Sequence, residues 1–202
     1  MRGVKQLALS LLVMGGAAIA FGTTLAAEDT VKGTQELAHK VRRALERLPY
    51  YGVYDFLAFK VEPGVVTLEG YAHRPSLKKE AESMIRHAAG VDVANKIEIL
   101  PSSSFDDQIR WTAFQRIYTD EFADRYVSGG TRQVQYDLVT MLRFPDMEPF
   151  GTYPVHIIVK HRRVALIGVV ITDADKTQIL LRARLVPHAI GVEDAIMVRA
   201  GR

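Results

Sequence analysis

The sequence predicts an α+β fold of two small αββαβ modules, each a three-stranded sheet packed with two helices. Two observations carry this prediction: an internal repeat, and the same order of helix and strand patterns in each copy. The chain has 202 residues, of which 48% are hydrophobic and 24% charged, as in an ordinary folded protein of one or two domains. The pattern does not determine the strand order.

The repeat consists of two sequence blocks that recur at nearly the same offset. VEPGVVTLEG at 61–70 aligns with VKHRRVALIG at 159–168 at an offset of 98, which matches Val66 with Val164 and Leu68 with Leu166. VDVANKIEI at 91–99 aligns with IGVEDAIMV at 190–198 at an offset of 99. Because the two offsets differ by a single residue, we expect a duplicated unit that buries equivalent aliphatic side chains in both copies.

The first copy is predicted over residues 34–100. Thr34 is a suitable N-cap for a leading helix that Pro49 ends, and Gly90 ends the second helix. Pro63-Gly64 is a turn pair between two strands, and Gly70 allows a bulge or a close backbone approach. The predicted strands and second helix span 56–61, 66–71, 75–88 and 93–99.

The second copy is predicted over residues 106–200, after a linker at 101–105. Asp106 or Asp107 is expected to cap its leading helix, and Thr172 with Asp175 forms a capping pattern for the later helix. A long connection at 119–153, rich in aromatic residues, is an insertion and a candidate partner-binding surface. The other elements are expected at 107–118, 155–159, 164–170, 173–186 and 190–198.

The N-terminus has the features of a secretory signal peptide at 1–27. Arg2 and Lys5 precede an uncharged run from 6 to 27, and small residues allow cleavage after 20 or after 26–27. The alternative is an uncleaved anchor, because the run of 22 residues is long enough to span a bilayer. Without Arg2 and Lys5 the chain has 24 basic and 23 acidic residues, which does not indicate a nucleic-acid binder.

The sequence lacks the signatures of catalysis and of metal binding. It contains no cysteine, no glycine-rich phosphate loop, no G-x-S-x-G and no H-E-x-x-H. The six histidines are scattered, and His156 and His161 are expected to point to opposite faces of a hairpin, as surface or turn residues. We therefore predict a protein that is not an enzyme and uses no cofactor or metal.

Two surface features of the second copy are candidate binding residues. The predicted hairpin tip carries Lys160, Arg162 and Arg163, which suit anionic lipid headgroups; a solvated turn is the alternative. On helix 173–186, two leucines lie opposite the core stripe and are bordered by arginines; this second set is Leu181, Leu185, Arg182 and Arg184. Such a face suits a protein or membrane interface, or else it is buried against the first copy or the insertion.

The repeated residues resemble the BON domain, a module of bacterial periplasmic proteins that include the osmotically inducible periplasmic protein family. The family pattern is V-x-L-x-G before a helix and a G-V-x-x-V-x-N-x-L-x-V ending, which the first copy follows with one residue fewer in its last block. In the second copy Asp194 replaces the usual Asn, and His161-Arg162 replaces a frequent Asn-Gly turn. The replacement argues against a tight type I′ turn there.

The resemblance implies an αββαβ fold, a periplasmic location, and association with phospholipid surfaces or envelope proteins, without catalytic residues. We therefore expect a non-enzymatic periplasmic protein that binds anionic phospholipid membrane surfaces, in envelope stress or osmotic protection. The alternative is a protein-binding or chaperone-like periplasmic adaptor.

Overall fold

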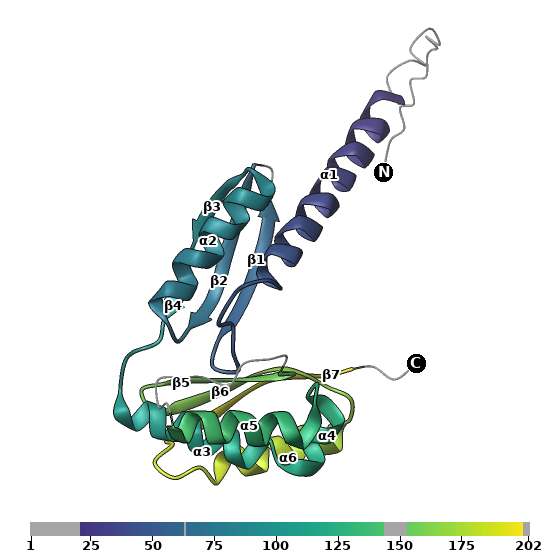
Figure 1. Ribbon diagram of the computed structural model, residues 1–202. Coiled ribbons are helices and arrows are strands. Elements are labelled where there is room, and N and C mark those ends of the chain that lie inside the picture. Colours follow the sequence, from purple (N-terminus) through teal and green to yellow (C-terminus); the bar gives the residue numbers. More distant parts are fainter. Residues whose placement is uncertain (1–20, 63, 144–152, 200–202) are drawn as a thin grey trace, which may run out of the picture.

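The computed structural model describes residues 21–62, 64–143 and 153–199. These residues form two α+β units, the first unit at 21–100 and the second unit at 104–199, as Figure 1 shows. The predicted fold class is confirmed, because each unit is a small mixed sheet packed against helices. Of the predicted signal peptide, residues 1–20 lie outside the described residues.

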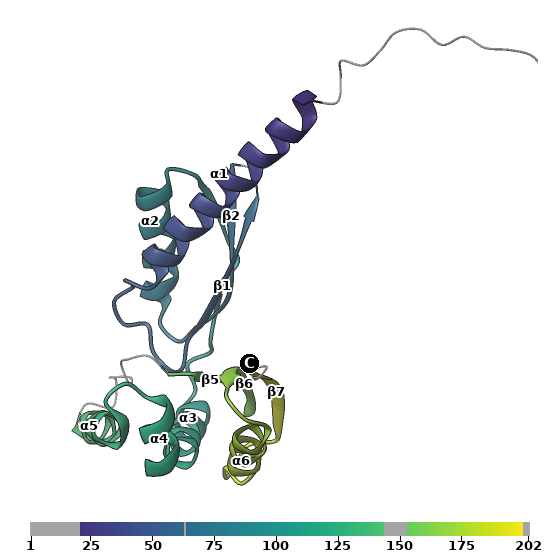
Figure 2. The ribbon, with the colours of Figure 1, turned by 90° about the vertical axis from the view of Figure 1, so that its right-hand side faces the viewer.

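The first unit has both of its helices on one face of the sheet (Figure 2). Strand β1 pairs antiparallel with β2, and β2 pairs in parallel with β3 and β4. The leading helix begins at Phe21, so the prediction that it starts at a Thr34 cap is wrong, and the predicted last strand is divided in two. The elements are α1 (Phe21–Leu45), β1 (Phe56–Glu62), β2 (Val65–Ala72), α2 (Pro75–Ala89), β3 (Asp92–Asn95) and β4 (Glu98–Ile99).

The second unit repeats this topology, with β5 antiparallel to β6 and β6 parallel to β7. The insertion contains two helices that the sequence analysis did not predict, and the Ser103 hydroxyl, not Asp106 or Asp107, caps the leading helix. The predicted Thr172 cap is confirmed, because its hydroxyl accepts from the Asp175 N–H. The elements are α3 (Ser104–Ile117), α4 (Asp120–Tyr126), α5 (Gly130–Arg143), β5 (Val155–Lys160), β6 (Arg163–Val170), α6 (Asp173–Arg184) and β7 (Gly191–Val198).

The aliphatic residues matched by the repeat occupy equivalent places. Val66 and Leu68 on β2, like Val164 and Leu166 on β6, are fully buried. Leu68 lies opposite Phe59 in the β1–β2 pair, and Leu166 lies opposite Ile157 in the β5–β6 pair, so the offset of 98 holds across both hairpins. The two sheets therefore bury the same strand face.

The glycine of the V-x-L-x-G pattern permits the same close approach in both units. A Cβ on Gly70 would lie 2.0 Å from the carbonyl oxygen of Phe56, and a Cβ on Gly168 would lie 2.0 Å from that of Pro154. Any larger residue would force the preceding strand away. The predicted close backbone approach at Gly70 is confirmed.

The last strand of each unit is tied to the second helix by a matching pair of side chains. In the first unit, the Lys78 ammonium donates to the Ile97 carbonyl (2.7 Å) and the Asn95 amide oxygen accepts from the Ile97 N–H (3.2 Å). In the second unit, Lys176 and Asp194 make the same two bonds to Ile196, at 2.7 and 2.9 Å. Replacing Asn by Asp thus preserves the contact, and in both units the contact satisfies backbone groups that would otherwise invite edge-to-edge pairing.

The inserted helices are attached to the second unit through Asp175, at the position of the first unit's buried Leu77. The Arg125 guanidinium and the Tyr126 hydroxyl, both on α4, donate to its carboxylate. Burial raises the pKa of Asp175, but hydrogen bonds from Thr172 and Tyr126 and the charge of Arg125 outweigh burial, so the pKa is held below its ordinary value.

Candidate functional site

The β5–β6 hairpin turns at His161 and Arg162, where both residues have positive φ angles, 50° and 65°. Positive φ at both central residues defines a type I′ turn, so the prediction against a tight turn of this type is wrong. Neither residue is a glycine, and each costs roughly 1–2 kcal/mol in this conformation. Another part of the fold must therefore hold the turn.

Asp106 holds this turn. Its carboxylate is buried, with 1% of the residue exposed, and it accepts from the backbone N–H of His161 (2.9 Å) and of Arg162 (2.8 Å). Hydrogen bonds to a charged acceptor are among the stronger ones in proteins. The sequence analysis assigned Asp106 to helix capping because it stands at a helix start. The only sequence signal of its support for the turn was that His161-Arg162 replaces the Asn-Gly pair frequent in the family.

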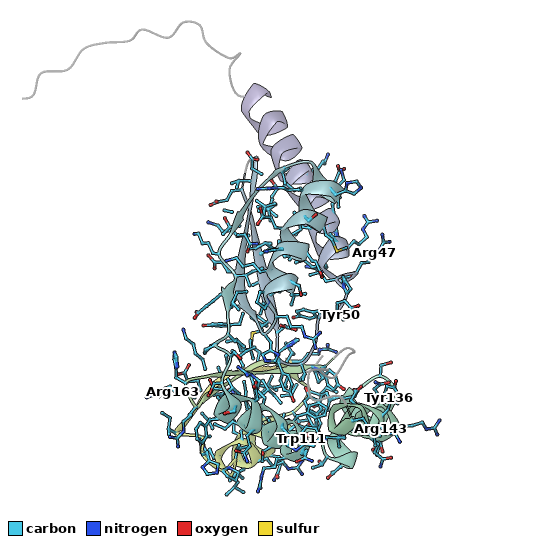
Figure 3. All side chains as sticks on the ribbon, turned by 60° about the vertical axis from the view of Figure 1, so that its left-hand side comes forward. Arg47, Tyr50, Trp111, Tyr136, Arg143 and Arg163 are labelled. Carbon is cyan, nitrogen blue, oxygen red and sulfur yellow. The ribbon has the colours of Figure 1, made fainter. Side chains whose placement is uncertain are left out.

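The three cations of the tip have different surroundings. Lys160 forms an ion pair with Glu98 of the first unit. The Arg162 Nε donates to the His188 carbonyl (2.9 Å), which ties the tip to the loop before β7. The exposed Arg163 lies opposite Gly191 in the β6–β7 pair, and Figure 3 shows it at the periphery of the second unit.

The outer face of α6 is exposed, so the alternative that it is buried against the first copy or the insertion is wrong. Leu181 is 49% and Leu185 is 64% exposed, and Arg184 is exposed as well. Arg182 is different, because its guanidinium donates to the Thr119 hydroxyl (2.5 Å) and so ties α6 to the insertion.

The end of α6 and the hairpin tip lie at the same end of the second unit. Ile190, which is 58% exposed, donates its backbone N–H to the Arg162 carbonyl at 2.9 Å. We name this end of the second unit the basic–apolar end, and its exposed basic and apolar residues are Arg162, Arg163, Arg184, Leu181, Leu185 and Ile190. Of the predicted residues, Lys160 and Arg182 are engaged elsewhere; Ile190 was missed because it lies in a predicted strand.

The two units are joined by the segment between α1 and β1. Val53 and Tyr54 are buried in the core of the second unit, and the Ile157 N–H donates to the Val53 carbonyl at 2.8 Å. His156 was predicted to be a surface or turn residue, but it lies against the rings of Tyr51 and Phe56. Burial lowers the pKa of His156, more than its backbone hydrogen bonds with Gly52 and Asp55 raise it.

Neither a metal cluster nor a bilayer-spanning helix is found in the described part of the chain. Within 21–62, 64–143 and 153–199, no three His, Asp or Glu side chains are grouped so as to hold a metal ion. Over the same residues, no helix has the length and apolar character that crossing a bilayer requires.

The fold and the two-unit arrangement define a small α+β protein built from two similar units. Residues 33–101 match the family model of the BON domain, so the chain contains a BON domain, which corresponds to the first unit. BON is a non-catalytic family.

Comparison with solved structures finds two chains of CdsD, a structural protein of the type III secretion system of Chlamydia trachomatis. One is 14% identical, with a TM-score of 0.25, and the match covers 81% of this chain and 92% of that one. The other, the C-terminal domain of CdsD, is 14% identical with a TM-score of 0.26, covering 80% of this chain and 96% of that one. Comparison with curated proteins finds no match.

Proposed function

We propose that this chain is a non-enzymatic periplasmic envelope protein that binds anionic phospholipid surfaces through the basic–apolar end of its second unit. The observation that carries the proposal is the exposure of Leu181, Leu185 and Ile190 at the same end of the second unit as the exposed Arg162, Arg163 and Arg184. The BON domain supports it, since BON domains are linked to membrane and phospholipid binding.

The physical contributions suit reversible binding. Burying the exposed half of one leucine or isoleucine side chain stabilises the bound state by about 1 kcal/mol. Each arginine near an anionic surface contributes about 1 kcal/mol at physiological ionic strength. The summed free energy of the six residues is larger than the contribution of any single exposed side chain. It is small beside the free energy gained when a transmembrane helix inserts into a bilayer.

We further propose that the second unit is a diverged BON module and that residues 1–27 are a secretory signal peptide. The shared topology, the paired glycines and the matching contacts of Lys78 with Asn95 and of Lys176 with Asp194 support the first point. The positive start and uncharged run of residues 1–27 support the second. Cell fractionation of the chain with and without residues 1–27 tests this export. The signal-peptide proposal is rejected if both forms stay in the cytoplasm.

Vesicle flotation tests lipid binding. The wild-type chain should float with vesicles containing phosphatidylglycerol and not with phosphatidylcholine vesicles. Arg163→Glu with Arg184→Glu should abolish flotation, while Arg132→Glu with Arg143→Glu makes the same charge change on exposed arginines of α5 and should retain it. Leu185→Ser with Ile190→Ser should weaken binding at least several-fold. Equal binding to both vesicle types, or equal loss in the two charge variants, rejects the proposed site.

A further inference from the structure

A short segment between α1 and β1 attaches the first unit to the second. Val53 and Tyr54 of this segment are buried in the core of the second unit, and the Ile157 N–H donates to the Val53 carbonyl. Tyr50, at the beginning of the segment, lies where the two units meet (Figure 3). Because β1 begins directly after the segment, at Phe56, the position of the first unit depends on how the segment is held.

His156 on β5 packs against both ends of this segment. Its imidazole ring lies 5.4 Å from the Tyr51 ring and 5.8 Å from the Phe56 ring, measured between ring centroids, at interplanar angles of 54° and 64°. The imidazole also makes backbone hydrogen bonds with Gly52 and Asp55. We call this contact of His156 with the segment and with Phe56 the joint.

The joint suits a neutral imidazole and not an imidazolium. The Nδ1 atom of His156 is buried, and among the residues that the structure describes it has no hydrogen-bond partner. A neutral imidazole tolerates this, because one of its two nitrogens carries no proton. An imidazolium has an N–H on both nitrogens, so Nδ1 would become a buried donor without an acceptor on a charged ring. Burial of such a group is strongly unfavourable.

The charged groups around the joint do not compensate for a proton on His156. At the end of α1, Arg42 and Glu46 line the same groove as His156, and their charges are opposite. The Asp55 carboxylate is buried and accepts from two backbone N–H groups, at 3.0 and 2.7 Å. On β6, the residue opposite His156 is the uncharged Ile167. The cation beside Glu46 and the two donors at Asp55 thus offset the anions near His156.

The two tyrosines that line this groove with His156 and have shifted pKa values are uncharged as well. Burial raises the pKa of Tyr51 to about 12 and raises the pKa of Tyr153 above its ordinary value, so neither phenol supplies an anion near neutral pH. Burial also lowers the pKa of His156, more than its backbone hydrogen bonds raise it. The arrangement of the joint therefore favours the neutral form of His156.

We propose that the joint is a pH-sensitive coupling, in which a proton on His156 separates Tyr51 and Phe56 from its ring and releases the first unit from its fixed position on the second. Water then reaches Nδ1 and accepts from the added N–H. The burial of Val53 keeps the segment attached to the second unit. The released state binds the proton first, so release begins as the pH falls below 6.5, the ordinary pKa of histidine.

A second histidine at the boundary between the units opposes His156. The His73 Nε2 lies 3.4 Å from the Asp107 Oδ1 on α3, and these groups form an ion pair only when His73 is protonated. Acid therefore adds an attraction between the units at this point. Both side chains are partly exposed, so the pair contributes little, and the buried His156 determines the net response.

Energy transfer between two dyes measures the position of the first unit relative to the second. The chain has no cysteine, so dyes attach only at introduced ones, and Ser83→Cys on α2 with Gln135→Cys on α5 places them at exposed sites of the two units. We expect one narrow distance distribution at about pH 7.5 and a reversible, several-fold increase in the population outside it at about pH 5. The fluorescence of Trp111 should stay constant, because the second unit remains folded.

His156→Phe keeps an aromatic ring without a titratable nitrogen and should hold the narrow distribution at both pH values. His39→Phe makes the same change at an exposed site of α1 and should respond to pH as the wild type does. Nuclear magnetic resonance of the wild-type chain needs no variant: the Phe56 amide should shift with the same midpoint as the His156 ring, below pH 6.5.

Three outcomes overturn the proposal. The first is a distance distribution of the wild type that stays unchanged down to about pH 5. The second is a His156→Phe chain that responds to pH as the wild type does. The third is a His156 ring that gains its proton while the Phe56 amide resonance stays in place.

Discussion

The hairpins β1–β2 and β5–β6 have the same strand register but hold their turns by different means. In the first hairpin, Gly64 takes a positive φ of 80° that glycine adopts without strain. In the second, His161 and Arg162 take positive φ angles because the buried Asp106 accepts both of their N–H groups. A two-residue connection between the strands is thus obtained either from local sequence or from a tertiary contact, and the second route leaves the turn free to carry a basic side chain.

The largest effect should come from the segment that joins the units. Tyr54→Ala removes a buried aromatic side chain from the core of the second unit, so we expect its free energy of unfolding to fall by about 4 kcal/mol. Fluorescence of the single tryptophan, Trp111 on α3, reports this unit. Although Tyr54 precedes β1 in the chain, the first unit should change little; a loss shared equally by both units would contradict this assignment.

Asp106→Ala should destabilise the second unit by about 3 kcal/mol, because two N–H groups lose a charged acceptor and the strained turn loses its support. Urea denaturation measures the change. Changing His161 and Arg162 to Asn-Gly in the same chain should recover most of the stability, since that pair adopts a type I′ turn unaided. If the double replacement recovers nothing, the carboxylate has another role.

The paired glycines provide a test of equivalence. Gly70→Ala and Gly168→Ala each place a methyl group 2.0 Å from a carbonyl oxygen, so each should destabilise its own unit by roughly 2–3 kcal/mol. Gly33→Ala, where the added Cβ has no neighbour within 4 Å, is the control. A large difference between the two unit-specific losses would show that the units do not share one strand geometry.

Acid should unfold the second unit at a higher pH than the first. Burial raises the pKa of Asp194, but hydrogen bonds from Lys176 and from the Ile196 N–H outweigh it and lower the pKa below its ordinary value, 3.8. As the pH falls, Asp194 therefore binds its proton in the unfolded state before it does so in the folded state. The stabilisation of the second unit by ionised Asp194 is complete above the ordinary pKa and is lost as the pH falls through the lowered pKa of the folded state. The pKa of Asp175 is lowered as well, with the same consequence.

The counterparts of Asp194 and Asp175 in the first unit are Asn95 and Leu77, which do not titrate. Asp194→Asn should therefore reduce the loss of stability between neutral pH and about pH 3, as followed by urea unfolding. Glu193→Gln, on the same strand, serves as the control. Identical pH profiles for wild type and Asp194→Asn would refute the assignment.

The smallest effect on stability is expected for the ion pair between Lys160 and Glu98. Both side chains are partly exposed, so Glu98→Gln should change the free energy of unfolding less than any of the variants above. The same change frees Lys160 beside the basic–apolar end and should strengthen binding to phosphatidylglycerol vesicles a few-fold. Unchanged vesicle binding would mean that Lys160 does not reach the lipid surface.

Part of the candidate site was accessible from the sequence. Helical periodicity placed Leu181 and Leu185 opposite the core stripe, and the hairpin assignment put Arg162 and Arg163 at a tip. Periodicity did not show that Arg182 bonds to Thr119 or that Lys160 pairs with Glu98, because those partners come from elements more than sixty residues away in the chain. Local patterns carry no information about which distant polar group lies within reach.

The sequence alone determined the two copies, the order of the helices and strands that they share, and the aliphatic residues that they bury, because those features follow from periodicities of neighbouring residues and from the repeat. Tertiary structure decided that the segment at Val53 completes the core of the other unit and that Asp106 supports a turn rather than a helix end. Each of these depends on hydrogen-bonding groups that meet only when separate elements pack together.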